Sequence, residues 1–255
     1  MTSLLHIHIV AYAGNAHTLP AVIEAARFAW PTAPIAVLDD RRAPVPHSAR
    51  RDLSSLRGVE YRLTRWPRGG NLRGYPCMRG LLREYRHSLR ASEAPYVLKL
   101  DADTLLLDSG PLVGLMLRGI DYAAHSTLDG PYGGGCILMS AAAVRVLVRA
   151  VRRAGSDMPP HAREDLTLGG LALASGRLAV ISLDGCTPVT TEGPHVFYAS
   201  VDTRETADTD YVARLSTKAA VVNVGTAGIT GGDRRDEARM AAALLGARYS
   251  GLRQR

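Results

Sequence analysis

Residues 96–107 read Tyr-Val-Leu-Lys-Leu-Asp-Ala-Asp-Thr-Leu-Leu-Leu, and this stretch is the strongest indication of the fold. Two carboxylates, Asp101 and Asp103, lie one residue apart between two apolar runs. Burying both charges is costly unless something neutralises them. Because residues i and i+2 of an extended segment point to the same side, the pair is expected to converge on a hard divalent cation that carries a phosphate. The alternative is a strand that ends in a solvated, Asp-rich turn.

The N-terminal segment predicts a β-α-β unit. Residues 4–12 are apolar on both faces, as in a central parallel strand; residues 19–30 have helical spacing; residues 35–38 form a second strand that runs into Asp39-Asp40. Ligands of such sheets bind beyond the carboxyl ends of the strands. Tyr12, the Asp39-Asp40 pair and the Asp101–Asp103 motif follow three of those ends, so we expect them to share one crevice.

The region between residues 41 and 90 is rich in arginine. A helix is expected over residues 48–56, a strand over 59–63, and a loop over 64–74 that leads into a helix from Pro76 to about Leu89. A glycine-containing loop with arginines that feeds a helix N-terminus suits a phosphate, and Arg73 is the nearest candidate. A solvated loop explains any single arginine equally well.

The second half adds a glycine-rich loop and an acidic pair. Residues 130–135 read Gly-Pro-Tyr-Gly-Gly-Gly and precede a strand at 136–140 and a helix at 141–154. Backbone at Gly134 and Gly135 can approach a ligand closely, although a tight connection has the same composition. Glu164 and Asp165 begin the next helix, where carboxylates also favour the helix dipole. A strand at 178–183, β-like runs at 196–201 and 219–224, and a terminal helix at 233–249 complete the pattern.

Composition sets the remaining limits. The 255 residues, 46% of them hydrophobic, suffice for one large α/β domain. The net charge of +7 indicates an anionic partner, although the Ala- and Arg-rich usage is also typical of a bacterial genome of high GC content. Three widely spaced cysteines fit a reducing compartment, and no apolar run suffices for a membrane span. We therefore expect a cytoplasmic protein, with peripheral attachment to an anionic inner membrane left open.

The ordered set of motifs resembles the nucleotide-sugar glycosyltransferases of the GT-A fold. Residues 131–140, Pro-Tyr-Gly-Gly-Gly-Cys-Ile-Leu-Met-Ser, are similar to the glycine-rich segment of the fringe and β1,3-galactosyltransferase group, and residues 164–169, Glu-Asp-Leu-Thr-Leu-Gly, resemble that group's Glu-Asp-Val-x-x-Gly. Lys99 to Thr104 supplies the Asp-x-Asp motif. The resemblance implies a Rossmann-like, mostly parallel sheet in a single domain over residues 1–255. Its nucleotide-binding half would be 1–108, and 109–255 its acceptor-binding half and C-terminal extension.

The same resemblance implies roles for the candidate residues. Asp101 and Asp103 would hold Mn²⁺ or Mg²⁺, with Asp101 also near the ribose and His195 as a third ligand. Tyr12 and Asp39, with Asp40 in reserve, would contact the base and ribose of a nucleoside diphosphate sugar.

An inverting transferase also needs a base for the acceptor hydroxyl. Asp165 is the first candidate, Glu164 the second, and His161 is a weaker candidate on the acceptor side. The acceptor itself, whether glycan, lipid-linked sugar, protein or metabolite, is not specified by these motifs.

Two other classes fit parts of the sequence. A sugar nucleotidyltransferase usually has Arg and Lys in a glycine-rich loop after the first strand, and residues 13–17, Ala-Gly-Asn-Ala-His, have neither. A non-catalytic basic protein that binds nucleotides or nucleic acid would suit the charge. Only 5% of residues are aromatic, however, so no stacking platform is indicated and no nucleic-acid partner is expected.

Overall fold

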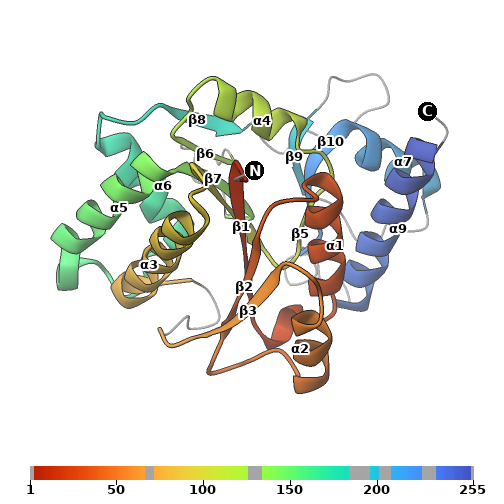
Figure 1. The fold of residues 1–255 in the computed structure, drawn as a ribbon, viewed down its shortest axis with the longest axis horizontal. Coiled ribbons are helices and arrows are strands. Elements are labelled where there is room, and N and C mark those ends of the chain that lie inside the picture. The colour runs from red at the N-terminus through yellow and green to blue at the C-terminus, as the bar shows by residue number, and fades with distance from the viewer. Residues whose placement is uncertain are drawn as a thin grey trace.

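The computed structural model describes residues 3–66, 72–125, 134–183, 196–200, 208–225 and 234–253 and contains two β-sheets (Figure 1). The large sheet has the strand order β3-β2-β1-β4-β7-β6-β8. Its strands are β1 (Leu5–Ala11), β2 (Ile35–Asp40), β3 (Val59–Thr64), β4 (Tyr96–Asp101), β6 (Tyr122–His125), β7 (Cys136–Ser140) and β8 (Val180–Leu183). The small sheet has the order β5-β10-β9, from β5 (Thr104–Leu106), β10 (Ala219–Asn223) and β9 (Val196–Ser200).

The register of the large sheet brings the predicted strand ends together. Strands β2, β1 and β4 are parallel neighbours, with Val10 opposite Asp101 and Ala11 opposite Asp39. Strand β7 is antiparallel to both β4 and β6, whereas β6 and β8 pair in parallel. The carboxyl ends of β1, β2 and β4 therefore share one edge, as the β-α-β pattern predicts.

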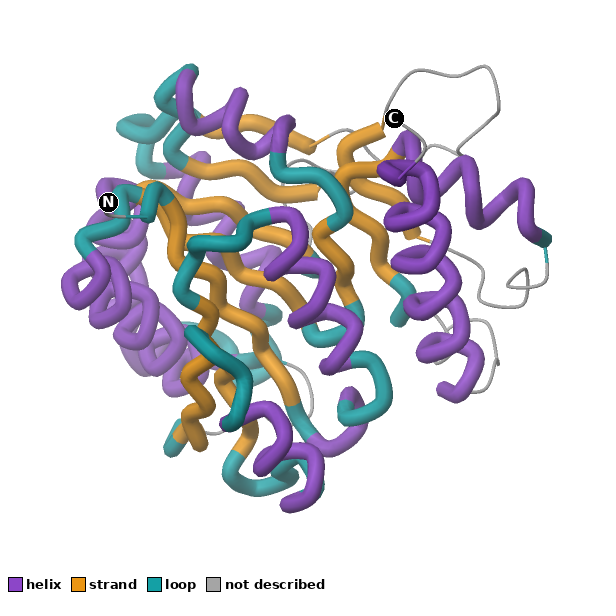
Figure 2. The backbone as a smooth tube through the Cα atoms, turned by 45° about the vertical axis from the view of Figure 1, so that its right-hand side comes forward, coloured by secondary structure: helices purple, strands orange, loops and turns teal. Residues whose placement is uncertain are grey.

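Alternate residues of β1 face two different hydrophobic layers. Leu5, Ile7 and Ile9 pack on one side with α1 (Leu19–Ala29) and α9 (Arg234–Arg253), while Val10 packs on the other with α3 (Gly74–Ser92). Helices α5 (Ala141–Ala154) and α6 (Glu164–Ala174) complete this second layer beside α3 (Figure 1), and Figure 2 shows helices on both faces of the strands. The remaining helices are α2 (His47–Ser54), α4 (Gly110–Leu117), α7 (Thr209–Lys218) and the short 3₁₀ turns η1 (Ala13–Asn15) and η2 (Gly155–Asp157). The sheet is thus covered on both faces, as an apolar central strand requires.

Most expected elements are confirmed, with shifted ends. The helix expected from Pro76 begins at Gly74 and continues to Ser92, and the helix expected over 48–56 spans His47–Ser54. Strand β5 and helix α7 were not expected from the sequence pattern. His195 and residues 130–133 lie outside the described residues. No described helix has both the length and the apolar content that crossing a bilayer demands.

Candidate active site

The Asp-x-Asp motif forms a turn between the two sheets. Asp101 is the last residue of β4, and Asp103 lies in the turn before β5. The expectation that both carboxylates point to one side of an extended segment is therefore wrong, because the chain bends at Ala102 to pass from one sheet to the other. The N–H of Asp101 donates to Gly135 O (2.9 Å), that of Ala102 to Val10 O (3.2 Å), and the hydroxyl of Thr18 donates to Ala102 O (2.6 Å). These bonds fix the turn from three sides.

A buried lysine joins the motifs that lie far apart in sequence. Lys99, on β4 two residues before Asp101, is 1% exposed. Its Nζ lies 2.8 Å from Asp101 Oδ1 and 3.6 Å from Glu164 Oε2, and it donates to the carbonyl of Gly134. The Asp-x-Asp motif, the glycine-rich segment and the acidic pair thus meet around one ammonium group.

The charges of this cluster depend on one another. Burial disfavours the charged form of Lys99, but the carboxylates of Asp101 and Glu164 outweigh it and hold the lysine pKa above its usual value. Burial raises the pKa of Glu164 to about 7, although Lys99 pulls it in the opposite direction. Glu164 is 2% exposed, and its Oε1 has no hydrogen-bond partner among the described residues. This carboxyl can therefore change its protonation state near neutral pH.

Asp165 lies beside Glu164 but has different contacts. Its Oδ2 is 2.8 Å from the guanidinium of Arg163, whose side chain is 57% exposed, and its Oδ1 accepts the N–H of Leu166 (2.9 Å). A Cβ on Gly134 would lie 2.8 Å from Asp165 Oδ2, so only glycine leaves room for this carboxylate. Asp165 therefore faces the glycine-rich segment, whereas Glu164 faces the lysine.

Asp103, in the turn before β5, contacts the small sheet. Its Oδ1 accepts from the side-chain amide of Asn223 on β10 (3.3 Å), and a Cβ on Gly225 would collide with its carboxylate. Burial, together with the carboxylates of Asp101 and Glu237, raises the pKa of Asp103 to about 7. Glu237 in turn contacts His17 Nε2 at 2.8 Å, which links α9 to the loop after β1.

The environment of Asp103 fits a hard cation. A buried carboxylate repelled by two others is stabilised by a divalent ion, and Mg²⁺ is commonly bound by one or two carboxylates plus phosphate oxygens. Within the described ranges, no three His, Cys, Asp or Glu side chains are arranged to hold a metal ion. Of the three carboxylates that act on one another here, Asp101 and Asp103 belong to the Asp-x-Asp motif, whereas Glu237 contacts His17.

The segments that enter α3 and α6 pair with each other at the same edge. Arg73 and Arg163 form an isolated antiparallel bridge, flanked by bonds from Gly74 N–H to Ala162 O (2.9 Å) and from Glu164 N–H to Leu72 O (2.8 Å). Gly74 adopts φ +74°, which disfavours a side chain. Two helix N-termini and two arginines therefore lie together, which favours an anion.

The predicted nucleotide-binding residues lie at the expected strand ends but have structural contacts of their own. Asp39 is fully buried, and its carboxylate accepts the N–H groups of Asp40 and Val45, both at 2.9 Å, and the hydroxyl of Tyr61. Asp40 accepts the N–H of Arg42 (2.9 Å). Tyr12 is partly exposed just after β1. Asp39 thus also organises the loop that follows β2.

No role was assigned from the sequence to Lys99 or to the buried polar residues near Glu164, which are Tyr85 and Tyr122. The signal for Lys99 was present: it is one of two lysines in the sequence, the other being Lys218, and it interrupts an apolar strand. Tyr85 of α3 and Tyr122 of β6 are fully buried, and the Glu164 carboxylate raises the pKa of both, after burial itself. His8 stacks edge-on against Tyr85, with ring centroids 5.0 Å apart.

No protein-family model matches the sequence, and a search of curated protein sequences finds no match. Solved structures do match. A glycosyltransferase involved in the glycosylation of the major capsid of PBCV-1 superposes with a TM-score of 0.52 at 11% identity, covering 94% of this chain and 100% of that one. The chain has a GT-A fold.

Two further glycosyltransferase structures complete the comparison. The bifunctional glycosyltransferase WbbM has a TM-score of 0.51 at 13% identity, over 88% of this chain and 46% of that one. The galactosyltransferase LgtC, solved with donor and acceptor sugar analogues, has a TM-score of 0.49 at 16% identity, over 96% of this chain and 95% of that one. At these identities the likeness concerns the fold, and the chemistry has to be argued from the site.

Proposed function

We propose that the protein is a metal-dependent, inverting glycosyltransferase that moves a hexosyl group from a nucleoside diphosphate sugar to an acceptor hydroxyl. The observation that carries the proposal is the contact of Lys99 with Asp101, Glu164 and the Gly134 carbonyl. The buried ammonium group of Lys99 thus contacts the motif predicted to bind the donor, the glycine-rich segment predicted to approach it, and the acidic pair predicted to supply the base. The fringe-like motif pattern supports a relative of that group.

The donor would lie along the edge formed by β1, β2 and β4. Tyr12 and Asp39, with Asp40 in reserve, would contact base and ribose, and Asp101 would contact the ribose from the other side. Arg73 and the N-terminus of α3 would face the diphosphate. Gly134 and Gly135 would let the backbone approach the sugar.

A divalent ion, Mn²⁺ or Mg²⁺, would be held by Asp101 and Asp103, and His195 remains the proposed third ligand. When bound, the ion stabilises the negative charge that the departing diphosphate gains. The pull of Lys99 on Asp101 and of Asn223 on Asp103 keeps the two carboxylates in place between the sheets.

We assign the base to Asp165 and a positioning role to Glu164. The Asp165 side chain is 9% exposed, but it borders Gly134 and its partner Arg163 is largely exposed, so movement of Arg163 would open the carboxylate to an acceptor hydroxyl. Glu164 is buried and forms an ion pair with Lys99, so it would hold the ammonium group near Asp101 and the glycine-rich segment. His161 is exposed two residues before Arg163 and remains an acceptor-side alternative.

A thermal-shift screen of UDP-, GDP-, CMP- and dTDP-sugars, with and without Mn²⁺, tests the donor assignment. One class should raise the melting temperature only when Mn²⁺ is present, because a ligand that binds the native state stabilises it. Asp103→Asn should abolish that shift, whereas Asp108→Asn, an exchange of a more distant aspartate, should keep it. A metal-independent shift retained in Asp103→Asn would contradict the metal site.

Kinetics with the donor so identified test the base. Asp165→Asn should lower kcat about 100-fold or more, with little change in donor affinity. Glu164→Gln should have the smaller effect on kcat. Equal rates in wild type and Asp165→Asn would remove Asp165 from the reaction. Pyrophosphate release from a nucleoside triphosphate would instead favour the nucleotidyltransferase.

A further inference from the structure

The outer face of the α3, α5 and α6 layer carries arginines at helical spacing. Helix α3 has Arg79, Arg83, Arg86 and Arg90 at intervals of four, three and four residues. Helix α5 has exposed Arg145, Arg149, Arg152 and Arg153, also on one side. Like charges three or four residues apart repel each other. Each helix therefore bears a stripe of one sign, whose charge is relieved when an anion binds.

Carboxylates of the same helices neutralise little of this positive charge. Helix α5 has none, and α3 has only Glu84, which is mostly buried and pairs with Arg62 of β3 (3.3 Å) as well as with Arg83 (3.7 Å). The two carboxylates of α6, Glu164 and Asp165, are buried in the candidate active site. The outward charge of the described part of this layer is thus strongly positive.

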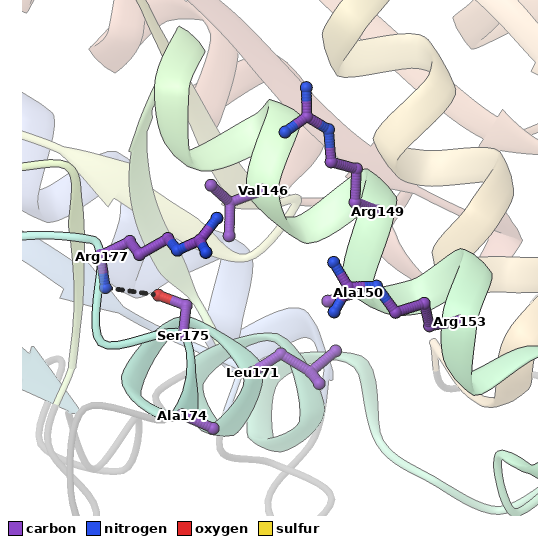
Figure 3. A pocket seen from close by; sticks show the side chains of 8 residues that line it. All are labelled: Val146, Arg149, Ala150, Arg153, Leu171, Ala174, Ser175 and Arg177. Atoms are coloured by element: carbon purple, nitrogen blue, oxygen red, sulfur yellow. Dashed lines mark hydrogen bonds between the residues drawn. The ribbon is translucent and has the colours of Figure 1, made fainter.

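Two pockets between the helices combine arginines with apolar side chains. One lies between α3 and α5, where Leu82, Val148 and Val151 are lined by Arg79, Arg83, Arg86 and Arg152. The other, of about 260 Å³, lies between α5 and α6. Figure 3 shows Arg177 and Arg153 extending toward the pocket from opposite sides, between Val146 and Leu171.

The exposed side of α6 is apolar rather than charged. Leu166 is 40% exposed and Leu173 43% exposed, one above the other at a spacing of seven residues. In the two pockets the arginines lie beside apolar side chains, such as Leu82 and Leu171, which suits a surface with anionic headgroups over hydrocarbon, because arginine keeps its head polar while its stem lies on apolar groups. Nucleic acid would supply phosphates but would gain little from exposed leucines, and no exposed aromatic side chain of these helices offers a stacking surface.

We propose that the outer face of α3, α5 and α6 docks on a bilayer that contains anionic lipids. The arginines bind the headgroups, and the leucines of α6 with the apolar floors of the two pockets meet the acyl region. This proposal does not depend on the glycosyltransferase assignment, because it uses residues outside the candidate site.

Co-sedimentation with vesicles tests it. The full-length protein should bind vesicles of equal parts phosphatidylcholine and phosphatidylglycerol, bind vesicles of phosphatidylcholine alone weakly, and be released by high sodium chloride. The variant Arg149→Glu, Arg152→Glu, Arg153→Glu should lower the partition coefficient about tenfold or more. A matched variant, Arg51→Glu, Arg57→Glu, Arg118→Glu, makes the same charge change at exposed arginines elsewhere and should keep most of the binding.

Exchanging the same three α5 arginines for Gln controls for misfolding. This variant should lose an intermediate part of the vesicle binding at an unchanged melting temperature. Equal losses in the two Glu variants would mean that net charge alone drives binding, and would overturn the proposal. Failure of the wild type to bind anionic vesicles would also overturn it. If the wild type bound only a mixed-sequence RNA, and the α5 variant lost that binding, the face would serve nucleic acid instead.

Discussion

Replacing Lys99 with Met should destabilise the fold through Glu164. Lys99 and Glu164 are 1% and 2% exposed, whereas the side chain of Asp101, the other partner, is 33% exposed and can be hydrated. Removing one member of a buried ion pair typically costs about 3–5 kcal/mol, because the remaining charge is left uncompensated. We expect a loss of about 3 kcal/mol in the free energy of unfolding at pH 8.5.

The loss should depend on pH in a defined direction. The pKa of Glu164 is about 7 in the folded protein, above the usual 4.5, so its contribution to stability is greatest below pH 4.5 and declines as pH rises to 7. Without Lys99 the folded pKa is higher still, and the decline continues above pH 7. The penalty of Lys99→Met should therefore be larger at pH 8.5 than at pH 6, because it grows above pH 7 by up to about 1.4 kcal/mol per pH unit.

Urea denaturation of four proteins measures this coupling. The set is the wild type, Lys99→Met, Glu164→Gln and the double variant, at both pH values. The double variant should recover at least about 1 kcal/mol at pH 8.5, since no unpaired buried charge remains. Lys218→Met, at the end of α7, is the control lysine exchange and should change stability by less than about 1 kcal/mol. A Lys99→Met penalty below that level, or one that is independent of pH, would refute the proposed link between Lys99 and Glu164.

Three further variants test other parts of the site. Gly134→Ala should leave the melting temperature nearly unchanged but lower kcat, because the added Cβ would lie 2.8 Å from Asp165 Oδ2 and displace that side chain. Unaltered kinetics would remove Asp165 from the site. Asp103→Asn should raise the melting temperature of metal-free protein at pH 8, since it removes a buried charge whose folded pKa is about 7, and the gain should vanish below pH 4; a destabilised variant at pH 8 would contradict this. His8 has a folded pKa well below 6.5 because it is buried, so the wild type should lose stability relative to His8→Met as pH falls from 6.5, by up to about 1.4 kcal/mol per pH unit in urea titrations. A constant difference would mean that the pKa of His8 is the same in the folded and unfolded states.

The strands of the large sheet were largely predictable, and so were β9 and β10 of the small sheet, whereas β5 was not. Strands such as β1 and β7 are apolar runs bounded by turns, and α5 has clear helical spacing, so periodicity suffices for them. Strand β5 has three residues, Thr104–Leu106, and exists because it pairs with β10, more than 100 residues later. A local pattern does not reveal such a partner.

The candidate site divides in the same way. The motif residues could be identified because carboxylates and glycines in apolar surroundings are conspicuous. Their exact orientation could not, because Asp101 still lies on β4, on the same side as Lys99, whereas the chain bends at Ala102 and brings Asp103 to Asn223. The hydrogen bonds by which Asp39 orders the loop after β2 could not be predicted from the sequence either, since Val45 and Tyr61 come close to Asp39 only in the folded chain.

Because the turn that carries Asp101 and Asp103 lies where the two sheets join, the position of Asp103 depends on contacts with residues 219–225. A product truncated before residue 196 would keep every strand of the large sheet and Asp101 on its edge. It would lack β10, Asn223 and Gly225, the support against which Asp103 rests. Such a fragment would have an incomplete pair of acids, and it would also lack α9 from the hydrophobic layer that covers Leu5, Ile7 and Ile9, so the site is assembled only when residues 219–253 are present.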